Sequence, residues 1–181
     1  MSDVIEIVDT WEDWGAQENP PRYRRGTGRG PEAWSNFEGL EVRVAMVRAP
    51  NYDPSVRVQI TGSEQAYRFM HPALRDEVVE SFYVMILSAK HHVMGINQVA
   101  KGGQMAVEVH PANVMRPVLA AGGVAFIVFH NHPSGDPEPS SEDRILTNRL
   151  KSASEILGLP ILDHIIVAPG TYVSMSDRGM L

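Results

Sequence analysis

Residues 124–143, VAFIVFHNHPSGDPEPSSED, begin with an apolar run that ends abruptly at two histidines. The run 124–129 has the composition of a buried β-strand. A loop rich in Pro, Ser and acidic residues follows, and a helical pattern starts near Ser140. The stretch therefore predicts a strand, a compact loop and a helix, with polar side chains gathered at both junctions.

Patterns of apolar residues on either side of this stretch predict an α/β fold. Alternation predicts strands at 41–48, 56–60, 80–87, 91–100, 105–109, 161–168 and 171–175. Helices are expected at 61–74, 111–122 and 140–157. The first has Thr61 and Glu64 in capping-box spacing. The last has an apolar stripe that consists of Leu146, Leu150, Ala153 and Leu157. We expect an α+β mixed sheet with helices packed on its faces.

The first 38 residues have the composition of a flexible polar leader, because they offer little apolar surface to bury. They contain an Arg-rich run, RYRRGTGRG, between Arg22 and Arg29. Three tryptophans are unusual for such a segment and could dock on the domain or on a partner: Trp11, Trp14 and Trp34. Residues 39–181 are expected to form one domain, with the motif-bearing core at 56–181.

Composition excludes several classes of site. The formal net charge of -6 argues against a protein built mainly to bind phosphate backbones. The chain has no cysteine, so any metal must be held by histidines and carboxylates. No apolar run approaches the roughly 20 residues of a membrane span, and no leader suggests secretion. A cytoplasmic location is therefore expected.

His130 and His132 are placed to reach one ion, because residues two apart on a strand point to the same face while Asn131 points away. Asp143 falls in the first helical turn after Ser140, where the helix dipole favours the ionised carboxylate. Two imidazoles and one carboxylate are a three-ligand set, which for Zn²⁺ leaves a fourth position for water and is typical of a catalytic site.

Such a site also needs a base that accepts a proton and returns it to the leaving amine. Glu80, directly ahead of the strand SFYVMIL, is the best candidate, and Glu77 is the reserve. A solvent-facing Glu80 at the start of a strand is the simpler alternative.

The spacing His130-x-His132, seven residues, Ser140, two residues, Asp143, with an upstream Glu, resembles the JAMM motif of the JAB/MPN-plus metallopeptidases. The wording HNHPSGDPEPSSED, followed by ILDHIIV and YVSMSDRGML, resembles the RadC-like branch, over roughly 56–181. The resemblance implies a cytidine-deaminase-like α/β fold and a zinc hydrolase that cleaves amide or isopeptide bonds. It also implies that His130, His132 and Asp143 bind Zn²⁺, that Glu80 is the base and that Ser140 steadies the oxyanion.

Other interpretations of the same residues remain open. Ser140 with an acid three residues later is also an ordinary capping box. His164 is expected to be a core histidine bonded to a neighbour, and His71, His91, His92 and His110 to be structural or exposed.

The family likeness suggests a protein or peptide substrate, with a ubiquitin-like conjugate as one candidate. A different class of function is a DNA-repair-associated module that binds nucleic acid through Arg22–Arg29 and uses the metal for stability. The sequence predicts no oligomeric state.

Overall fold

The computed structural model describes residues 57–102 and 109–181. The chain divides into two units, Met1–Pro54 and Ser55–Leu181, and all described residues belong to the second. The expected leader and the strand expected at 41–48 therefore lie outside the described residues, as does the strand expected at 105–109 except for its last residue.

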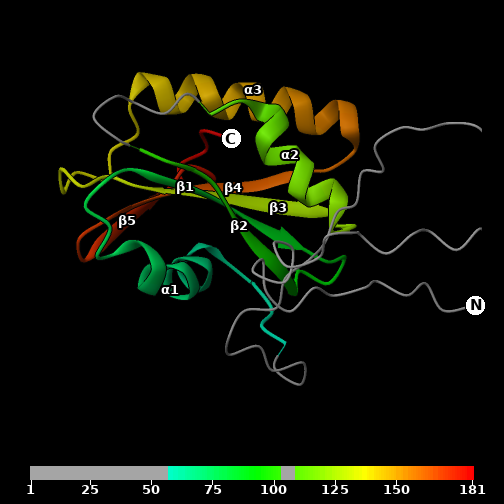
Figure 1. The fold of residues 1–181 in the computed structure, drawn as a ribbon, viewed down its shortest axis with the longest axis horizontal. Helices are drawn as coiled ribbons and strands as arrows, with labels where there is room; N and C mark the ends of the chain where they lie inside the picture. The colour runs from blue at the N-terminus through cyan, green and yellow to red at the C-terminus, as the bar shows by residue number, and fades with distance from the viewer. Residues whose placement is uncertain (1–56, 103–108) are drawn as a thin grey trace, which may run out of the picture. The chain divides into compact units, whose positions relative to one another are not determined.

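Five strands form one mixed sheet in the order β2-β1-β3-β4-β5 (Figure 1). Their bounds are β1 Ser81–Leu87, β2 Val93–Lys101, β3 Ala125–Asn131, β4 Ile161–Ala168 and β5 Thr171–Ser174. β1 runs antiparallel to β2 and β3, β3 runs parallel to β4, and β4 runs antiparallel to β5. A parallel pair needs a crossover, which here contains helix α3 (Ser141–Leu157). The predicted mixed sheet with flanking helices is confirmed.

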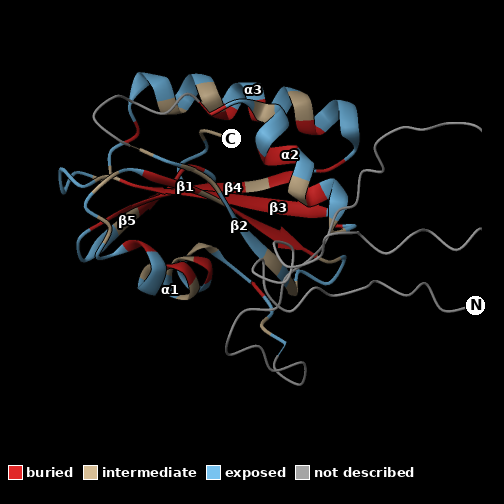
Figure 2. Cartoon of the chain, viewed as in Figure 1, coloured by how far each residue is buried: buried red, intermediate tan, exposed pale blue. Residues whose placement is uncertain are grey.

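Helices cover both faces of the sheet. Helix α1 (Ser63–Leu74) lies on one face, and α2 (Pro111–Ala120) and α3 lie on the other (Figure 1). Figure 2 shows β3 buried along its whole length, with the outer surfaces of α2 and α3 exposed. None of the described helices combines the length and the apolarity needed to cross a lipid bilayer.

Alternation along β3 decides which side chains face which helix. Phe126 and Val128 belong to the buried cluster on the α2 and α3 side. Ile127 and Phe129 belong to the cluster on the α1 side. Because successive strand residues alternate, His130 continues the row that faces α3, and Asn131 continues the row that faces α1. The sheet therefore directs His130 toward the start of α3.

Two predictions for residues 57–64, a strand and a helix cap, are wrong. Among residues 57–60 the only pairing is an isolated bridge between Gln59 and His92, so no strand forms there. Helix α1 begins at Ser63 with Gly62 as its N-cap and no side-chain cap, so the Thr61–Glu64 capping box does not form. Gln65 takes the place of Glu64 as the partner of Thr61, because Gln65 Oε1 accepts from the Thr61 amide and from the Thr61 hydroxyl, each at 2.9 Å.

The apolar stripe predicted on α3 is right in part. Leu150 is fully buried, and Leu146 and Ala153 pack against the same cluster. Leu157 is 43% exposed, contrary to expectation. The buried face of α3 instead includes two polar residues, Thr147 and Ser154, so its centre is rotated from the predicted stripe.

Candidate metal centre

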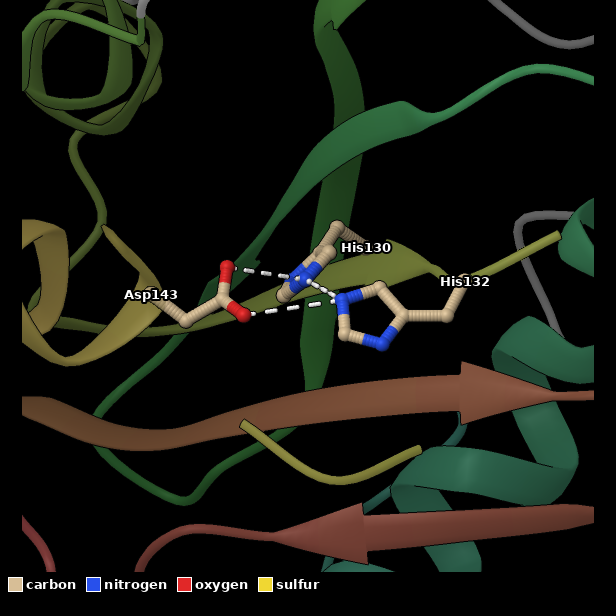
Figure 3. A group of neighbouring side chains, drawn as sticks. All are labelled: His130, His132 and Asp143. Atoms are coloured by element: carbon tan, nitrogen blue, oxygen red, sulfur yellow. Dashed lines mark hydrogen bonds and ion pairs between the residues drawn. The ribbon is translucent and has the colours of Figure 1, made fainter. Parts of the chain in front are cut away.

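Three side chains meet at the carboxyl end of β3, one from the strand, one from the loop directly after it and one from the first turn of α3 (Figure 3). They are His130, His132 and Asp143, and one nitrogen or oxygen atom of each lies within 4.8 Å of the others. His130 Nε2 is 2.9 Å from His132 Nε2 and 3.0 Å from Asp143 Oδ1. His132 Nε2 is 3.5 Å from Asp143 Oδ2. The structure thus brings together the three residues that the sequence predicts as ligands.

Helix capping fixes the position of Asp143. Ser140 is the N-cap of α3, and its Oγ accepts from the Asp143 amide at 3.1 Å. In return, Asp143 Oδ2 accepts from the Ser140 amide at 2.8 Å. The turn before the helix contains Gly135 at a φ of 90°, a conformation that favours glycine. Gly135 therefore allows the turn in the loop, and the capping box fixes Asp143 in the first turn of the helix that follows.

Each imidazole is also bonded on the side that faces away from this group. His132 Nδ1 lies 2.7 Å from the Asp136 carbonyl oxygen, which can only accept, so His132 Nδ1 carries the hydrogen. His132 Nε2, when the ring is neutral, then presents a lone pair to the centre. His130 Nδ1 lies 2.8 Å from His164 Nε2.

Asp143 and His132 shift each other's pKa values. Partial burial would raise the pKa of Asp143, but its interactions with the imidazole rings of His130 and His132 outweigh this effect and hold that pKa well below its usual range. The bond to Asp143 in turn raises the pKa of His132. Asp143 is therefore a carboxylate, the form that binds a metal ion.

The residues fit a divalent cation. A tetrahedral zinc ion with bonds of about 2.0–2.1 Å needs ligand atoms about 3.3 Å apart. The two Nε2 atoms are 2.9 Å apart, and each lies near that spacing from a different Asp143 oxygen, with His130 3.0 Å from Oδ1 and His132 3.5 Å from Oδ2. A His-His-Asp group compatible with a metal site is therefore present, and Zn²⁺ stays the predicted ion.

Comparison with known proteins gives the family. The family described as RadC-like JAB domain matches residues 60–180. The chain belongs to this family. A UPF0758 protein of Symbiobacterium thermophilum is 38% identical over 128 residues, which cover 71% of this chain and 55% of the relative. A UPF0758 protein of Trichlorobacter lovleyi is 42% identical over 123 residues, which cover 68% of this chain and 54% of the relative.

A third relative has a similar identity. A UPF0758 protein of Methanosarcina mazei is 37% identical over 123 residues, which cover 68% of this chain and 54% of the relative. This RadC-like chain thus spans about half the length of the curated relatives it matches. The predicted family is confirmed, and the predicted boundary near residue 38 stays a prediction.

The two candidate bases of the RadC-like domain differ in their surroundings. Glu80 is exposed directly before β1, and its negative charge contributes to raising the pKa of His132, after the larger effect of the Asp143 hydrogen bond. The carboxylate of Glu77 is paired with Lys101, with Nζ at 2.7 Å from Oε2. These surroundings favour Glu80, whose role as the base stays a prediction.

Ser140 uses its hydroxyl group within the helix cap. Besides accepting from the Asp143 amide, it donates to Asp143 Oδ2 at 2.6 Å. The capping-box interpretation is therefore confirmed. The predicted oxyanion role would require the hydroxyl hydrogen to turn away from Asp143.

Sequence reasoning missed the contribution of Asn131, which lies between the two histidines. Its side chain faces away from the metal group, as predicted, and is 3% exposed. Asn131 Oδ1 accepts from the Ser81 amide at 2.8 Å. Asn131 Nδ2 donates to the carbonyl oxygens of Glu77, at 3.2 Å, and Val79, at 3.0 Å. Asn131 therefore ties strand β3 to the segment that contains both candidate bases.

His164 is a buried core histidine bonded to neighbours, as predicted, and burial lowers its pKa well below the ordinary value. Its second partner, Thr147 Oγ1 at 2.6 Å, was not foreseen. Thr147 and His164 lie on different elements, α3 and β4, so no local sequence pattern indicates their contact. None of the remaining histidines in residues 57–102 and 109–181 joins a metal-competent group.

Proposed function

We propose that this RadC-like JAB domain is a zinc-dependent metallohydrolase that cleaves a peptide or isopeptide bond. The observation that carries the proposal is the convergence of His130 Nε2, His132 Nε2 and a carboxylate oxygen of Asp143 within 4.8 Å. The three residues would hold the ion. When bound, zinc would polarise a substrate carbonyl and lower the pKa of a coordinated water toward about 7.

The protein's own groups have separate tasks in this proposal. Glu80 accepts a proton from the attacking water and passes it to the leaving amine, so the protonated carboxyl is the transient state. Its exposure at the start of β1 leaves its carboxylate accessible. Ser140 would donate its hydroxyl hydrogen to the developing oxyanion in place of Asp143.

A hollow beside His132 is the proposed place for a part of the substrate away from the cleaved bond, because His132 lines it and His130, Asp143 and Glu80 do not. Its volume is about 410 Å³, and it lies at the carboxyl ends of the parallel strands β3 and β4, where open α/β sheets commonly bind ligands. Its wall includes the segment 74–78, and Val78 within that segment is 86% exposed. We propose a protein or peptide as the substrate, with a ubiquitin-like conjugate as one candidate.

The test is turnover by the zinc-loaded full chain against a quenched peptide library and an isopeptide-linked ubiquitin-like conjugate. Glu80→Gln should keep its zinc and lose about 10²–10⁴-fold in rate, as expected for a general base. Glu77→Gln is the matched control and should retain most of the rate, because Lys101 already engages that carboxylate. A Glu80→Gln variant as active as the wild type would refute the assignment of the base, and a wild type with bound zinc and no turnover would refute the peptidase.

The nucleic-acid alternative has no support among the residues that the structure describes, because the Arg-rich run lies outside them. It predicts a salt-sensitive DNA affinity that falls when Arg22, Arg24, Arg25 and Arg29 are replaced by Gln. DNA binding that is unchanged by those substitutions would reject it.

A further inference from the structure

A line of buried polar side chains runs behind the predicted metal ligands. It starts at His130, whose Nδ1 lies 2.8 Å from His164 Nε2. His164 Nδ1 lies 2.6 Å from Thr147 Oγ1, which in turn donates to the Asp143 carbonyl oxygen at 2.6 Å. All three side chains are nearly inaccessible, with His130 6%, His164 0% and Thr147 1% exposed. The line therefore connects one predicted ligand to the backbone of another.

The Asp143 carbonyl oxygen, at the end of the line, determines which atom donates in each hydrogen bond. The Asp143 carbonyl oxygen can only accept, so the single hydroxyl hydrogen of Thr147 is directed to it. Met175 Sδ, at 3.4 Å from Thr147 Oγ1, is a weak acceptor and does not alter this direction. With its hydrogen used, Thr147 Oγ1 must accept from His164 Nδ1.

The same reasoning assigns the donor in the bond between His164 and His130. His164 is fully buried and has His130 and Thr147 as its ring hydrogen-bond partners and Phe82 against its ring, at 5.6 Å between centroids. None of these groups is a carboxylate, so a charged imidazole there would lack a compensating partner. A neutral His164 with its hydrogen on Nδ1 has only a lone pair on Nε2. His130 must therefore donate from Nδ1.

We infer that His164 and Thr147 are positioning residues that keep a hydrogen on Nδ1 of His130, so that Nε2 is the nitrogen that this ring offers to a metal ion. A neutral imidazole with its hydrogen on Nδ1 can bind a cation only through Nε2. That atom lies 2.9 Å from His132 Nε2 and 3.0 Å from Asp143 Oδ1. The line thus selects the metal-binding nitrogen of His130 and fixes the plane of its ring.

The effect of this positioning on metal affinity can be predicted. Partners that hydrogen-bond to metal-binding histidines typically change metal affinity about 10–100-fold when removed. Thr147→Val keeps the shape of the side chain and removes the acceptor, whereas Thr147→Ser keeps the hydroxyl. For His164, Gln can accept with its oxygen and donate with its nitrogen, so His164→Gln preserves both bonds in the same direction.

The experiment measures zinc affinity by competition with a chelator in the full chain, together with ¹⁵N spectra of the imidazole rings. Thr147→Val should weaken zinc binding about 10–100-fold, and Thr147→Ser and His164→Gln should stay close to the wild type. Equal affinity in the wild type and Thr147→Val would overturn the inference. In the wild type, His164 should carry its hydrogen on Nδ1, and a spectrum with it on Nε2 would overturn the inference independently of any variant.

The affinity measurement rests on the proposed function, but the spectrum does not. If the wild type bound no zinc, the metallohydrolase proposal would fail, while the tautomer of His164 in the metal-free protein would still support or refute the direction of the line. If Thr147→Val did not fold, the wild-type spectrum would decide the question.

Discussion

Asn131 lies between the two histidines in the sequence and faces the opposite side of the sheet. Its three hydrogen bonds reach the backbone of residues 77, 79 and 81, so it holds the segment from which Glu80 projects. The tripeptide 130–132 thus serves both predicted parts of the site, since its outer residues are predicted ligands and its central residue holds the segment that contains the candidate base.

Removing the Asn131 side chain should be costly. Asn131→Ala leaves the buried Ser81 amide without its acceptor and two carbonyl oxygens without a donor, so we expect a loss of about 2–4 kcal/mol in the free energy of unfolding. Chemical denaturation measures this loss. Asn148→Ala, at an exposed position of α3, is the control and should change stability by less than about 0.5 kcal/mol. Similar values for the two variants would contradict the proposed role of Asn131.

Single residues mark the limit of what the sequence could predict. The metal group was predictable because its spacing follows from strand alternation and helix capping. The partners of Asn131 and His164 were not, because both occupy strands that otherwise read as apolar and bond to residues distant in sequence. The chain has no local pattern that announces such contacts.

At the level of elements, the start of helix α3 depends on one serine. Ser140 forms both halves of a capping box with Asp143. Ser140→Ala should therefore lower the free energy of unfolding of the metal-free protein by about 1 kcal/mol, within a range of about 0.5–2 kcal/mol.

A serine within the same helix provides the control for that measurement. Ser152 is exposed in the middle of α3, where alanine is the better helix former, so Ser152→Ala should be neutral or slightly stabilising. Thermal unfolding of both variants measures the difference. Destabilisation by Ser152→Ala as large as that by Ser140→Ala would mean that capping is not the cause.

Strand β4 contains a buried acid that joins the last segments of the chain. Asp163 accepts from the Ser174 hydroxyl at 2.6 Å, from the Ser176 amide at 3.0 Å and from the His164 amide at 2.7 Å. Burial raises the pKa of Asp163 in spite of these bonds. A carboxyl group with a raised pKa in the folded state makes the protein less stable as the pH rises from the unfolded pKa through the folded pKa.

This linkage gives a pH-dependent prediction. Asp163→Asn cannot ionise, so its stability relative to the wild type should increase as the pH rises from about 4 toward neutrality. Denaturation of both proteins at several pH values measures the trend. A difference that stays constant or narrows with rising pH would contradict the raised pKa.

Most helices and strands were predictable because their apolar sequence patterns agree with their burial in the folded domain. β3, β4 and α3 have strong apolar patterns and clear boundaries, and they form close to where they were expected. Residues 57–60 have a strand pattern too, but only one bridge pairs them with the turn before β2. Pairing partners, and not the local pattern, decide whether such a segment becomes a strand.

At the scale of the whole molecule, the sheet brings every predicted part of the site to one end. His130 lies at the end of β3 and His132 directly after it, Asp143 is in the first turn of the crossover helix, and Glu80 precedes the antiparallel neighbour β1. The strand order that creates this convergence could not be read from the patterns alone. The resemblance of the motif supplied the expected fold class, and the match over residues 60–180 shows the family.

Metal binding should therefore stabilise the folded domain as a whole. A ligand that binds only the folded state adds about 2.7 kcal/mol at a concentration of 100 times its Kd. Zinc should raise the Tm of the wild type, and a chelator should reverse the increase. A Tm that is insensitive to both would argue against a folded-state site.

The most direct measurement is the zinc content of the purified full chain and its Asp143→Ala variant, together with Glu142→Ala as the neighbouring control. Glu142 is an exposed acid in the same helical turn and lies outside the metal-competent group. We predict one tightly held zinc per chain in the wild type and in Glu142→Ala, and strong loss in Asp143→Ala. Equal zinc content in all three proteins would contradict the His130, His132 and Asp143 centre.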